Sequence, residues 1–499
     1  MAKFSLSDKV AIVVLSNVIS GVSGLVLSMI LVRILSMSDY GTYKQIMLIS
    51  TIVTVIFSLG IPRSIAYFIP RVKIERAGFV IQSIIILSLL GLTSSCILWC
   101  LSKNIGDYFN NPDLSKLLKI LSIYLFFTFP AAYFNYLLLA VDRQKLSAGL
   151  SIVNTIIAFI VIIPLFLGYG LAGLIGWMVV FGSISCGLML FYTVYLMKGW
   201  EFNWNRQLLR SQLKYTLPRG FADIVGGLGV MVDKIVISIF FSVQEYAIYA
   251  VGTSKIGLLE MLFSPVGNVL MPKFSELHHQ YQNEELIQLW HKYISKIALI
   301  ILPIGVFLFT MGEKIITLLF TKNYIESTNI LRIYLCTVPA RMLLYGEVLE
   351  GIGQTKFIFT GAVLFFILNI ILNLLFVQIM GFIGPAIGIL LSVYLTIFFF
   401  LFIIKHSLKI PFVGILPWRN LINIFIVASG CSFLIYPITF FNYPDLFTLL
   451  MAGLVFISVY IILIFKVGII TSDDIEFIKR WLNLKDIVVS KDERNQIKR

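Results

Sequence analysis

Charged residues are scarce in this sequence. Asp, Glu, Lys and Arg together make up 13% of its 499 residues, whereas soluble domains carry roughly 25%. Hydrophobic residues reach 59%, and the mean hydropathy is +0.95. This composition excludes an ordinary soluble domain and predicts a polytopic helical membrane protein.

Cysteine and histidine are also rare. The five cysteines fall within apolar stretches and form no Cys-x-x-Cys pair, and the four histidines fall in predicted loops. The sequence therefore indicates neither a disulfide framework nor a metal centre. The predicted loops also lack a constellation suited to nucleophilic or acid–base chemistry. We expect no catalytic residue, no metal, no cofactor and no enzyme activity.

The net charge of +14 has two possible meanings. Binding of nucleic acid requires an exposed basic domain, and the sequence contains none, so no nucleic-acid partner is expected. The alternative is a membrane topology signal, which can be tested on the predicted spans. Windows of about 20 apolar residues predict fourteen transmembrane helices and an all-α fold. The spans lie near residues 10–32, 45–69, 79–101, 114–140, 147–168, 171–197, 214–241, 245–272, 293–312, 327–349, 356–379, 382–404, 419–438 and 446–466.

With the N-terminus inside, most of the 39 Lys and Arg residues fall in cytoplasmic segments, as the positive-inside rule requires. An even number of spans then returns the C-terminus to the same side. We therefore expect a multi-pass protein of the cell inner membrane with both termini in the cytoplasm.

The chain repeats itself. Ser36–Gln45 reads SMSDYGTYKQ and Ser242–Val251 reads SVQEYAIYAV, and other short matches recur at offsets of about 200–212 residues. Spans 1–6 and 7–12 are therefore predicted to be two copies of one six-helix unit in the same orientation, and spans 13 and 14 an addition. The predicted divisions are an N-terminal lobe (1–197), a cytoplasmic linker (198–213), a C-terminal lobe (214–405), two extra helices (406–466) and a cytoplasmic tail (467–499).

The seventh span, within Lys214–Tyr249, carries an unusual number of charges. A charge at bilayer depth costs at least ~2.5–3.5 kcal/mol on insertion scales, so several in one span require a reason. Arg219 and Asp223 are four residues apart, so they share a helix face and can pair. Pro218 loosens the helix. A span of this kind is expected to line a wet cavity, although an Arg219 near a helix end could instead extend to the lipid headgroups.

Fixed cations in such a cavity favour an anionic substrate, because Arg offers bidentate donors to phosphate. The candidate substrate-binding residues are Arg219, Asp223, Arg63, Arg341 and Lys255. The candidate coupling residues are Glu260 and Asp233, since intramembrane carboxylates often mark ion or proton pathways. Glu260 has an alternative role as a structural partner of Lys255.

Two motifs resemble a known family. The run from Arg33 to Tyr43 resembles the end of the first helix in the polysaccharide-exporter (Wzx-like flippase) group of the MOP exporter superfamily, and the run from Asp233 to Tyr249 resembles that group's motif across helices seven and eight. Ala247 stands where the family usually has Gly. The resemblance implies two six-helix lobes around a central cavity that opens alternately to each side. It also implies a substrate, an oligosaccharide on a polyprenyl diphosphate, moved to the outer leaflet for surface polysaccharide synthesis.

Two further expectations accompany the resemblance, namely H⁺ or Na⁺ coupling and contact with polysaccharide polymerase or assembly proteins. A MATE-type cation-coupled multidrug antiporter remains the alternative function. Such an antiporter needs an anionic cavity for cationic drugs, whereas the cations in the spans of this chain are at least as numerous as the acids.

Overall fold

The computed structural model describes residues 6–72, 75–200, 203–254, 256–441 and 443–468. These residues form α-helices and short 3₁₀ turns, with no strand among them. The predicted all-α fold is therefore confirmed. The predicted tail lies almost wholly outside the described residues.

The first half of the chain forms nine helices. They are α1 (Leu6–Ile34), α2 (Met37–Ser58), α3 (Ile61–Phe68), α4 (Arg76–Tyr108), α5 (Pro112–Ala131), α6 (Phe134–Ala140), α7 (Gln144–Ile160), α8 (Ile163–Phe166) and α9 (Gly170–Leu196). Several predicted spans are broken helices. The second span, for example, comprises α2 and α3, which are separated by Leu59 and Gly60, both in left-handed conformation.

The second half of the chain is also helical. Its helices are α10 (Arg206–Gly229), α11 (Val232–Phe240), α12 (Val243–Thr253), α13 (Ile256–His279), α14 (Asn283–Phe320), α15 (Ser327–Leu335), α16 (Val338–Arg341), α17 (Tyr345–Gly351), α18 (Thr355–Met380), α19 (Gly384–Leu408), α20 (Trp418–Ile435) and α21 (Asp445–Lys466). Four 3₁₀ turns complete it: η1 (Lys322–Tyr324), η2 (Gly381–Ile383), η3 (Phe412–Gly414) and η4 (Tyr436–Phe440).

Every predicted span coincides with a helix or a run of helices. In the described residues, nine helices or helix runs are long and apolar enough to cross a bilayer by themselves. Others are interrupted, as α15, α16 and α17 are, and such short pieces do not meet the length criterion. The polytopic membrane architecture is thus confirmed, whereas the count of fourteen stays a prediction.

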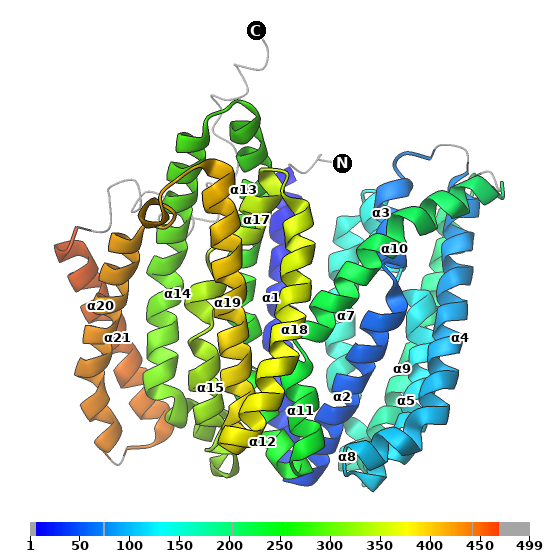
Figure 1. The fold of residues 1–499 in the computed structure, drawn as a ribbon. Coiled ribbons are helices and arrows are strands. Elements are labelled where there is room, and N and C mark those ends of the chain that lie inside the picture. Colours follow the sequence, from blue (N-terminus) through cyan, green and yellow to red (C-terminus); the bar gives the residue numbers. More distant parts are fainter. Residues whose placement is uncertain (1–5, 73–74, 201–202, 255, 442, 469–499) are drawn as a thin grey trace.

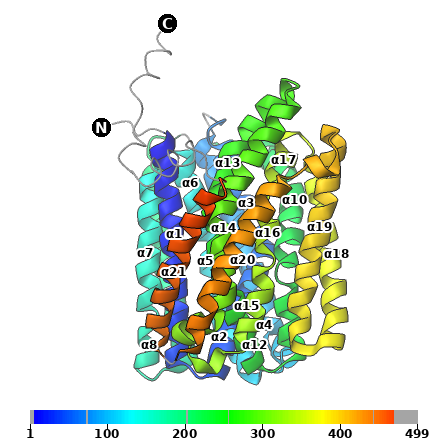
Figure 2. The same ribbon diagram turned by 90° about the vertical axis from the view of Figure 1, so that its left-hand side faces the viewer.

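The helices form two bodies with α20 and α21 at one outer edge (Figures 1 and 2). One body, the N-lobe, contains α1–α9, and the other, the C-lobe, contains α11–α19. Helix α1 begins and α21 ends at the same end of the molecule, here named the terminal face. At the other end, named the opposite face, α2 packs along α12. Toward the terminal face the ribbons of the two lobes diverge (Figure 1).

The two sequence repeats begin equivalent helices. Ser36 is the N-cap of α2 and accepts a hydrogen bond from the backbone N–H of Asp39, at 3.1 Å. Ser242 is the N-cap of α12 and accepts one from the N–H of Glu245, at 3.3 Å, while the Glu245 carboxylate accepts a hydrogen bond from the backbone N–H of Ser242, at 2.8 Å. At Ser242 these reciprocal bonds form a capping box, whereas at Ser36 the Asp39 carboxylate accepts a hydrogen bond from the Ser36 hydroxyl, at 2.7 Å.

Candidate functional site

Helix α10 belongs to neither lobe alone. It packs on α2, α3 and α4 of the N-lobe, and in its last turns it also packs on α18 of the C-lobe. On the N-lobe side the backbones approach closely, because a Cβ on Gly220 would lie only 2.6 Å from the carbonyl carbon of Leu59. On the C-lobe side Asn369 donates a hydrogen bond to the carbonyl of Gly229, at 2.5 Å. Pro218 lies inside the helix, two residues before Gly220.

A buried polar network fixes the first half of α10. The Gln212 amide nitrogen donates to the hydroxyls of Ser64 and Ser83, both at 2.9 Å, and its oxygen accepts from Gln82 at 2.7 Å. All four side chains are buried. Because unpaired polar groups are costly in an apolar interior, this closed set specifies how α10 sits on α3 and α4.

Sequence reasoning missed this network, because residues 198–213 were predicted to be a linker. Helix α10 begins within that segment, at Arg206. The available signal was Asn205, whose side chain caps the helix by accepting from the N–H groups of Gln207 and Leu208. The division of the chain into lobes and linker stays a prediction.

Three of the predicted binding residues meet at the α3–α10 contact. Asp223 Oδ1 lies 3.5 Å from Arg219 Nε, as the four-residue spacing predicts, and its Oδ2 lies 3.2 Å from Arg63 Nη1. The side chains of Arg63 and Arg219 are 54% and 64% exposed, and that of Asp223 is 35% exposed. Two guanidinium groups thus share one carboxylate, which leaves a net positive charge and N–H donors directed away from Asp223.

The other predicted binding residues lie elsewhere. Arg341 is the last residue of α16, in the C-lobe, and is partly buried. Lys255 lies outside the described residues. Glu260 falls within α13, but its side chain is outside the described part of the structure. The structure therefore assembles Arg219, Asp223 and Arg63 and places Arg341 apart from them.

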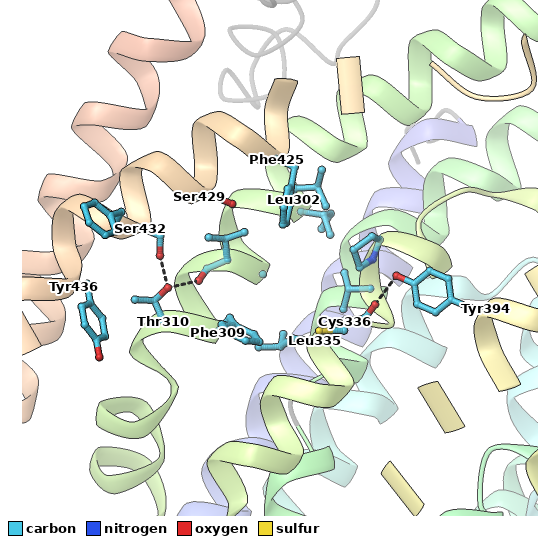
Figure 3. Close-up of a pocket in the computed structure, with 16 residues that line it drawn as sticks. Leu302, Phe309, Thr310, Leu335, Cys336, Tyr394, Phe425, Ser429, Ser432 and Tyr436 are labelled. Carbon is cyan, nitrogen blue, oxygen red and sulfur yellow. Dashed lines mark hydrogen bonds between the residues drawn. The ribbon is translucent and has the colours of Figure 1, made fainter. Parts of the chain in front are cut away.

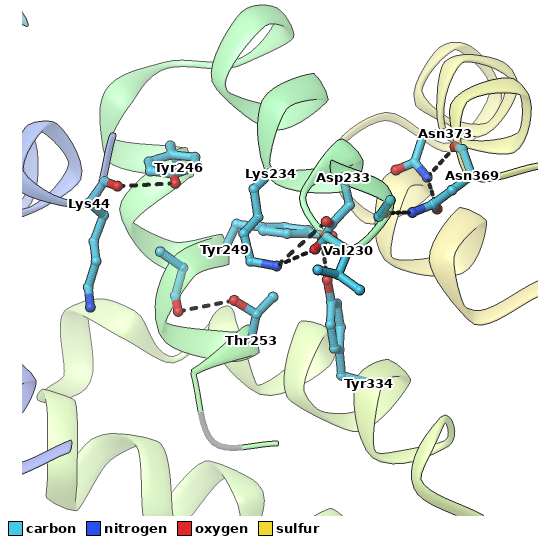
Figure 4. Close-up of polar contacts among 12 residues, drawn as sticks. Lys44, Val230, Asp233, Lys234, Tyr246, Tyr249, Thr253, Tyr334, Asn369 and Asn373 are labelled. Atoms are coloured by element: carbon cyan, nitrogen blue, oxygen red, sulfur yellow. Dashed lines mark hydrogen bonds and ion pairs between the residues drawn. The ribbon is translucent and has the colours of Figure 1, made fainter. Parts of the chain in front are cut away.

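Asp233 occupies a second polar site, enclosed in the C-lobe (Figure 4). Its side chain is fully buried, and its Oδ2 accepts hydrogen bonds from the hydroxyls of Tyr249, at 2.8 Å, and Tyr334. Its Oδ1 has no hydrogen-bond donor and lies 3.6 Å from the ammonium of Lys234. The tyrosines come from α12 and α15, so only the fold could reveal them. The second carboxylate oxygen is therefore held only by the ion pair with Lys234.

The opposite face is closed by contacts between the lobes, here named the gate. A Cβ on Gly41 of α2 would overlap the carbonyl oxygen of Val243 at the start of α12. The hydroxyl of Tyr246 donates to the carbonyl of Lys44, at 3.4 Å (Figure 4). The rings of Tyr40 and Tyr324 meet edge to face with centroids 5.9 Å apart. Small residues permit such close packing of helices in membranes.

Arg33 strengthens the gate from the end of α1. Its guanidinium donates to the carbonyls of Leu318 and Leu319 in the last turn of α14, both at 2.7 Å. The C-terminal carbonyls of a helix lack intrahelical partners and carry partial negative charge, which a cation stabilises. Arg33 therefore links the N-lobe to the C-lobe at the opposite face.

Comparisons with known proteins agree with this architecture. A family model described as a polysaccharide biosynthesis protein matches residues 30–329. No curated protein sequence matches the chain. Among solved structures, the lipid II flippase MurJ in an inward closed conformation aligns with a TM-score of 0.73 at 20% identity, covering 90% of this chain and 96% of that one.

Two further structures share the fold. An inward-facing multidrug resistance MATE family transporter of the MOP superfamily aligns with a TM-score of 0.65 at 16% identity, covering 78% of this chain and 95% of that one. A MOP superfamily transporter from Pyrococcus furiosus, described by a binding pocket of reverse polarity, aligns with a TM-score of 0.56 at 15% identity, covering 82% and 100%.

Proposed function

The chain belongs to the polysaccharide biosynthesis protein family, and from this premise we propose that it is a flippase for polyprenyl-diphosphate-linked oligosaccharides. It moves repeat units across the cytoplasmic membrane by alternating access, for the synthesis of surface polysaccharide such as O-antigen, capsule or exopolysaccharide. The fold that it shares with a lipid II flippase supports this proposal.

The observation that carries the proposal is the cluster of Arg63, Asp223 and Arg219. Charges exposed by a third to two thirds, within helices of a membrane protein, require water or lipid headgroups around them, and in this proposal the cluster faces an aqueous space between the lobes. Asp223 holds both guanidinium groups in place by ion pairs of 3.2 and 3.5 Å. Their remaining N–H donors suit the oxygens of a diphosphate, which Arg binds in bidentate geometry.

The closed gate indicates to which side of the membrane the space between the lobes opens. With both termini in the cytoplasm, the opposite face is the outer one, and the lobes diverge toward the inside (Figure 1). The structure then represents an inward-facing state that receives substrate from the inner leaflet. Transport requires the contacts of Arg33 and Gly41 with the C-lobe to separate, so that the lobes can open outward.

The charge of the cluster distinguishes this function from multidrug antiport. A site for cationic drugs needs an excess of carboxylates, whereas the cluster holds two arginines and one aspartate. The cluster therefore favours an anionic substrate.

Asp233 is the coupling site in this proposal. Its buried carboxylate has one oxygen free of hydrogen-bond donors, and Asn369 and Asn373 of α18 lie beside it (Figure 4). A carboxylate in such surroundings binds H⁺ or Na⁺ when the adjacent Lys234 moves away. Glu260 stays a second candidate. The expected partners are the polymerase and assembly proteins of the same membrane.

Replacement of Arg219 tests the proposal. Arg219→Lys keeps the charge but loses the planar fork, so export of lipid-linked oligosaccharide should fall to a small fraction of wild type, and Arg219→Ala should abolish it. The measurement is complementation of a flippase-deficient strain, with protein in the membrane quantified in parallel. Lys214→Ala, an exposed lysine on the same helix, is the matched control. Full complementation by Arg219→Lys would reduce Arg219 to a headgroup anchor.

A further inference from the structure

Helices α19 and α20 follow each other in the chain but are held apart in space. Helix α20 packs on α14 and α21, whereas α19 packs on α18, α15 and α17. Between α19 and α20 two adjoining cavities of about 560 and 610 Å³ open to the membrane side of the protein. Both cavities are lined by Leu302, Pro339, Tyr394 and Phe425, so they form one continuous crevice.

The walls of this crevice are apolar along most of its length (Figure 3). Phe398 of α19 and Phe425 of α20 are 58% and 51% exposed. Three of its polar side chains bond within the protein, since Tyr394 donates to the carbonyl of Cys336 at 2.8 Å and Thr310 bonds to Ser432. A recess of this kind cannot stay empty or wet inside a bilayer, so a hydrocarbon chain fills it.

A basic group lies on α19 beyond the crevice, toward the terminal face. Lys405, His406 and Lys409 line a further cavity of about 430 Å³, together with Phe402 and Ile410. Phe398, Phe402, Lys405 and Lys409 recur at helical spacing on α19, so the basic group lies on the same side of the helix as the apolar wall. In the described part of the chain neither Lys405 nor Lys409 forms an ion pair.

The charged residues around this cavity are all basic. From Gly351 to Pro444 the sequence contains no Asp or Glu, while Lys356, Lys405, Lys409 and Arg419 all carry positive charge. Neutralising the dipole at the end of α19 needs only one cation in the last turn, yet three basic residues surround the cavity. This excess of positive charge makes the cavity suitable for an anion from outside the protein.

We propose that the crevice between α19 and α20 binds one anionic phospholipid, with an acyl chain along Tyr394, Phe398 and Phe425 and its phosphate at Lys405, His406 and Lys409. Basic pockets between transmembrane helices on the cytoplasmic side are suited to anionic headgroups. This occupant differs from the transported substrate, whose proposed contacts lie on α3 and α10. The proposal therefore stands or fails independently of the transport function.

Native mass spectrometry of the purified full-length protein tests the headgroup site. Phosphatidylglycerol and phosphatidylcholine are added separately to delipidated protein, and we expect one phosphatidylglycerol to be retained preferentially. Lys405→Gln with Lys409→Gln should weaken that binding about thirtyfold and remove the preference over phosphatidylcholine. Lys198→Gln with Arg210→Gln, which removes two exposed charges elsewhere on the chain, should leave it unchanged. Equal binding by both pairs would overturn the headgroup assignment.

A second variant tests the acyl-chain site. Gly305 of α14 lines the crevice, and a Cβ there meets nothing within 4 Å. Gly305→Leu therefore fills the crevice without a clash and should reduce retention of both phospholipids about tenfold or more, whereas Gly149→Leu, also in open space, should not. Unchanged retention in Gly305→Leu would overturn the proposal. So would displacement of phosphatidylglycerol by equimolar undecaprenyl phosphate, because the crevice would then hold a polyprenyl chain.

Discussion

Gly41 offers a direct test of alternating access. It lies within α2 against the first residue of α12, and a methyl group there would overlap the carbonyl oxygen of Val243 and lie 2.7 Å from its Cγ1. The overlap exists only while the gate is closed. Helix propensity acts in the other direction, since Ala is favoured over Gly by about 1 kcal/mol within a helix, but that gain is present in every conformation. Gly41→Ala should therefore destabilise the closed gate selectively.

The size of the effect follows from the contact. Overpacking of one methyl group costs roughly 1–3 kcal/mol, which corresponds to a shift of about 5- to 150-fold in the equilibrium between closed and open gates. Val243→Ala removes Cγ1 but leaves the carbonyl oxygen in place. The double variant should therefore recover only part of the closed population.

Distance measurements between spin labels on the two lobes distinguish the closed gate from the open gate. Labels at Asp113 and Asn323, exposed residues near the opposite face of each lobe, are introduced after replacement of the five native cysteines. The short-distance population should fall in Gly41→Ala and stay constant in Gly24→Ala and Gly149→Ala, where the added methyl group meets nothing within 4 Å. An unchanged distance distribution in Gly41→Ala would refute the role assigned to this contact.

Three further predictions concern the repeat, the network on α10 and the coupling site. Ser36→Ala and Ser242→Ala should each lower the stability in detergent by about 1 kcal/mol, and clearly unequal losses in thermal unfolding would contradict the equivalence of the two motifs. Gln212→Leu should cost roughly 1–3 kcal/mol in the same assay, because its buried partners lose a hydrogen bond, whereas the exposed Gln207→Leu should cost little. Asp233→Asn should remove the dependence of transport in proteoliposomes on a Na⁺ or pH gradient, and a retained dependence would exclude Asp233 as the coupling site.

The sequence predicted much of the fold because apolar length is a direct signal in a membrane chain. Each predicted span coincides with helical residues, and the Arg219–Asp223 pair follows from helix spacing alone. The breaks inside spans were not predictable from hydropathy, because Leu59 adopts a left-handed conformation that its residue type does not favour. Likewise, the polar composition of residues 198–213 predicted a linker, whereas helix α10 begins within that segment, at Arg206.

The site was predictable only in part for a similar reason. Local spacing places two side chains on one helix face, but a third partner from another helix depends on tertiary structure. Arg63 joins Asp223 from a distance of 160 residues, and Tyr334 joins Asp233 from a distance of 101 residues. The role of Arg33 also depends on tertiary structure, because its guanidinium binds carbonyls at the end of α14, about 285 residues away in the sequence.

The double attachment of α10 has a mechanical consequence. Asp223 lies on the part of the chain that is fastened to the N-lobe, and Asp233 lies just beyond the turn that is fastened to α18. Both sites therefore lie on one segment, from α10 to the start of α11, whose conformation depends on the angle between the lobes. Binding at one site can therefore change the affinity of the other without contact between the ligands, provided each ligand prefers a different conformation of this segment. Helix α1 likewise contacts both lobes, through α7 on one side and through α13 and α14 on the other, so each half of the chain begins with a helix that joins the lobes.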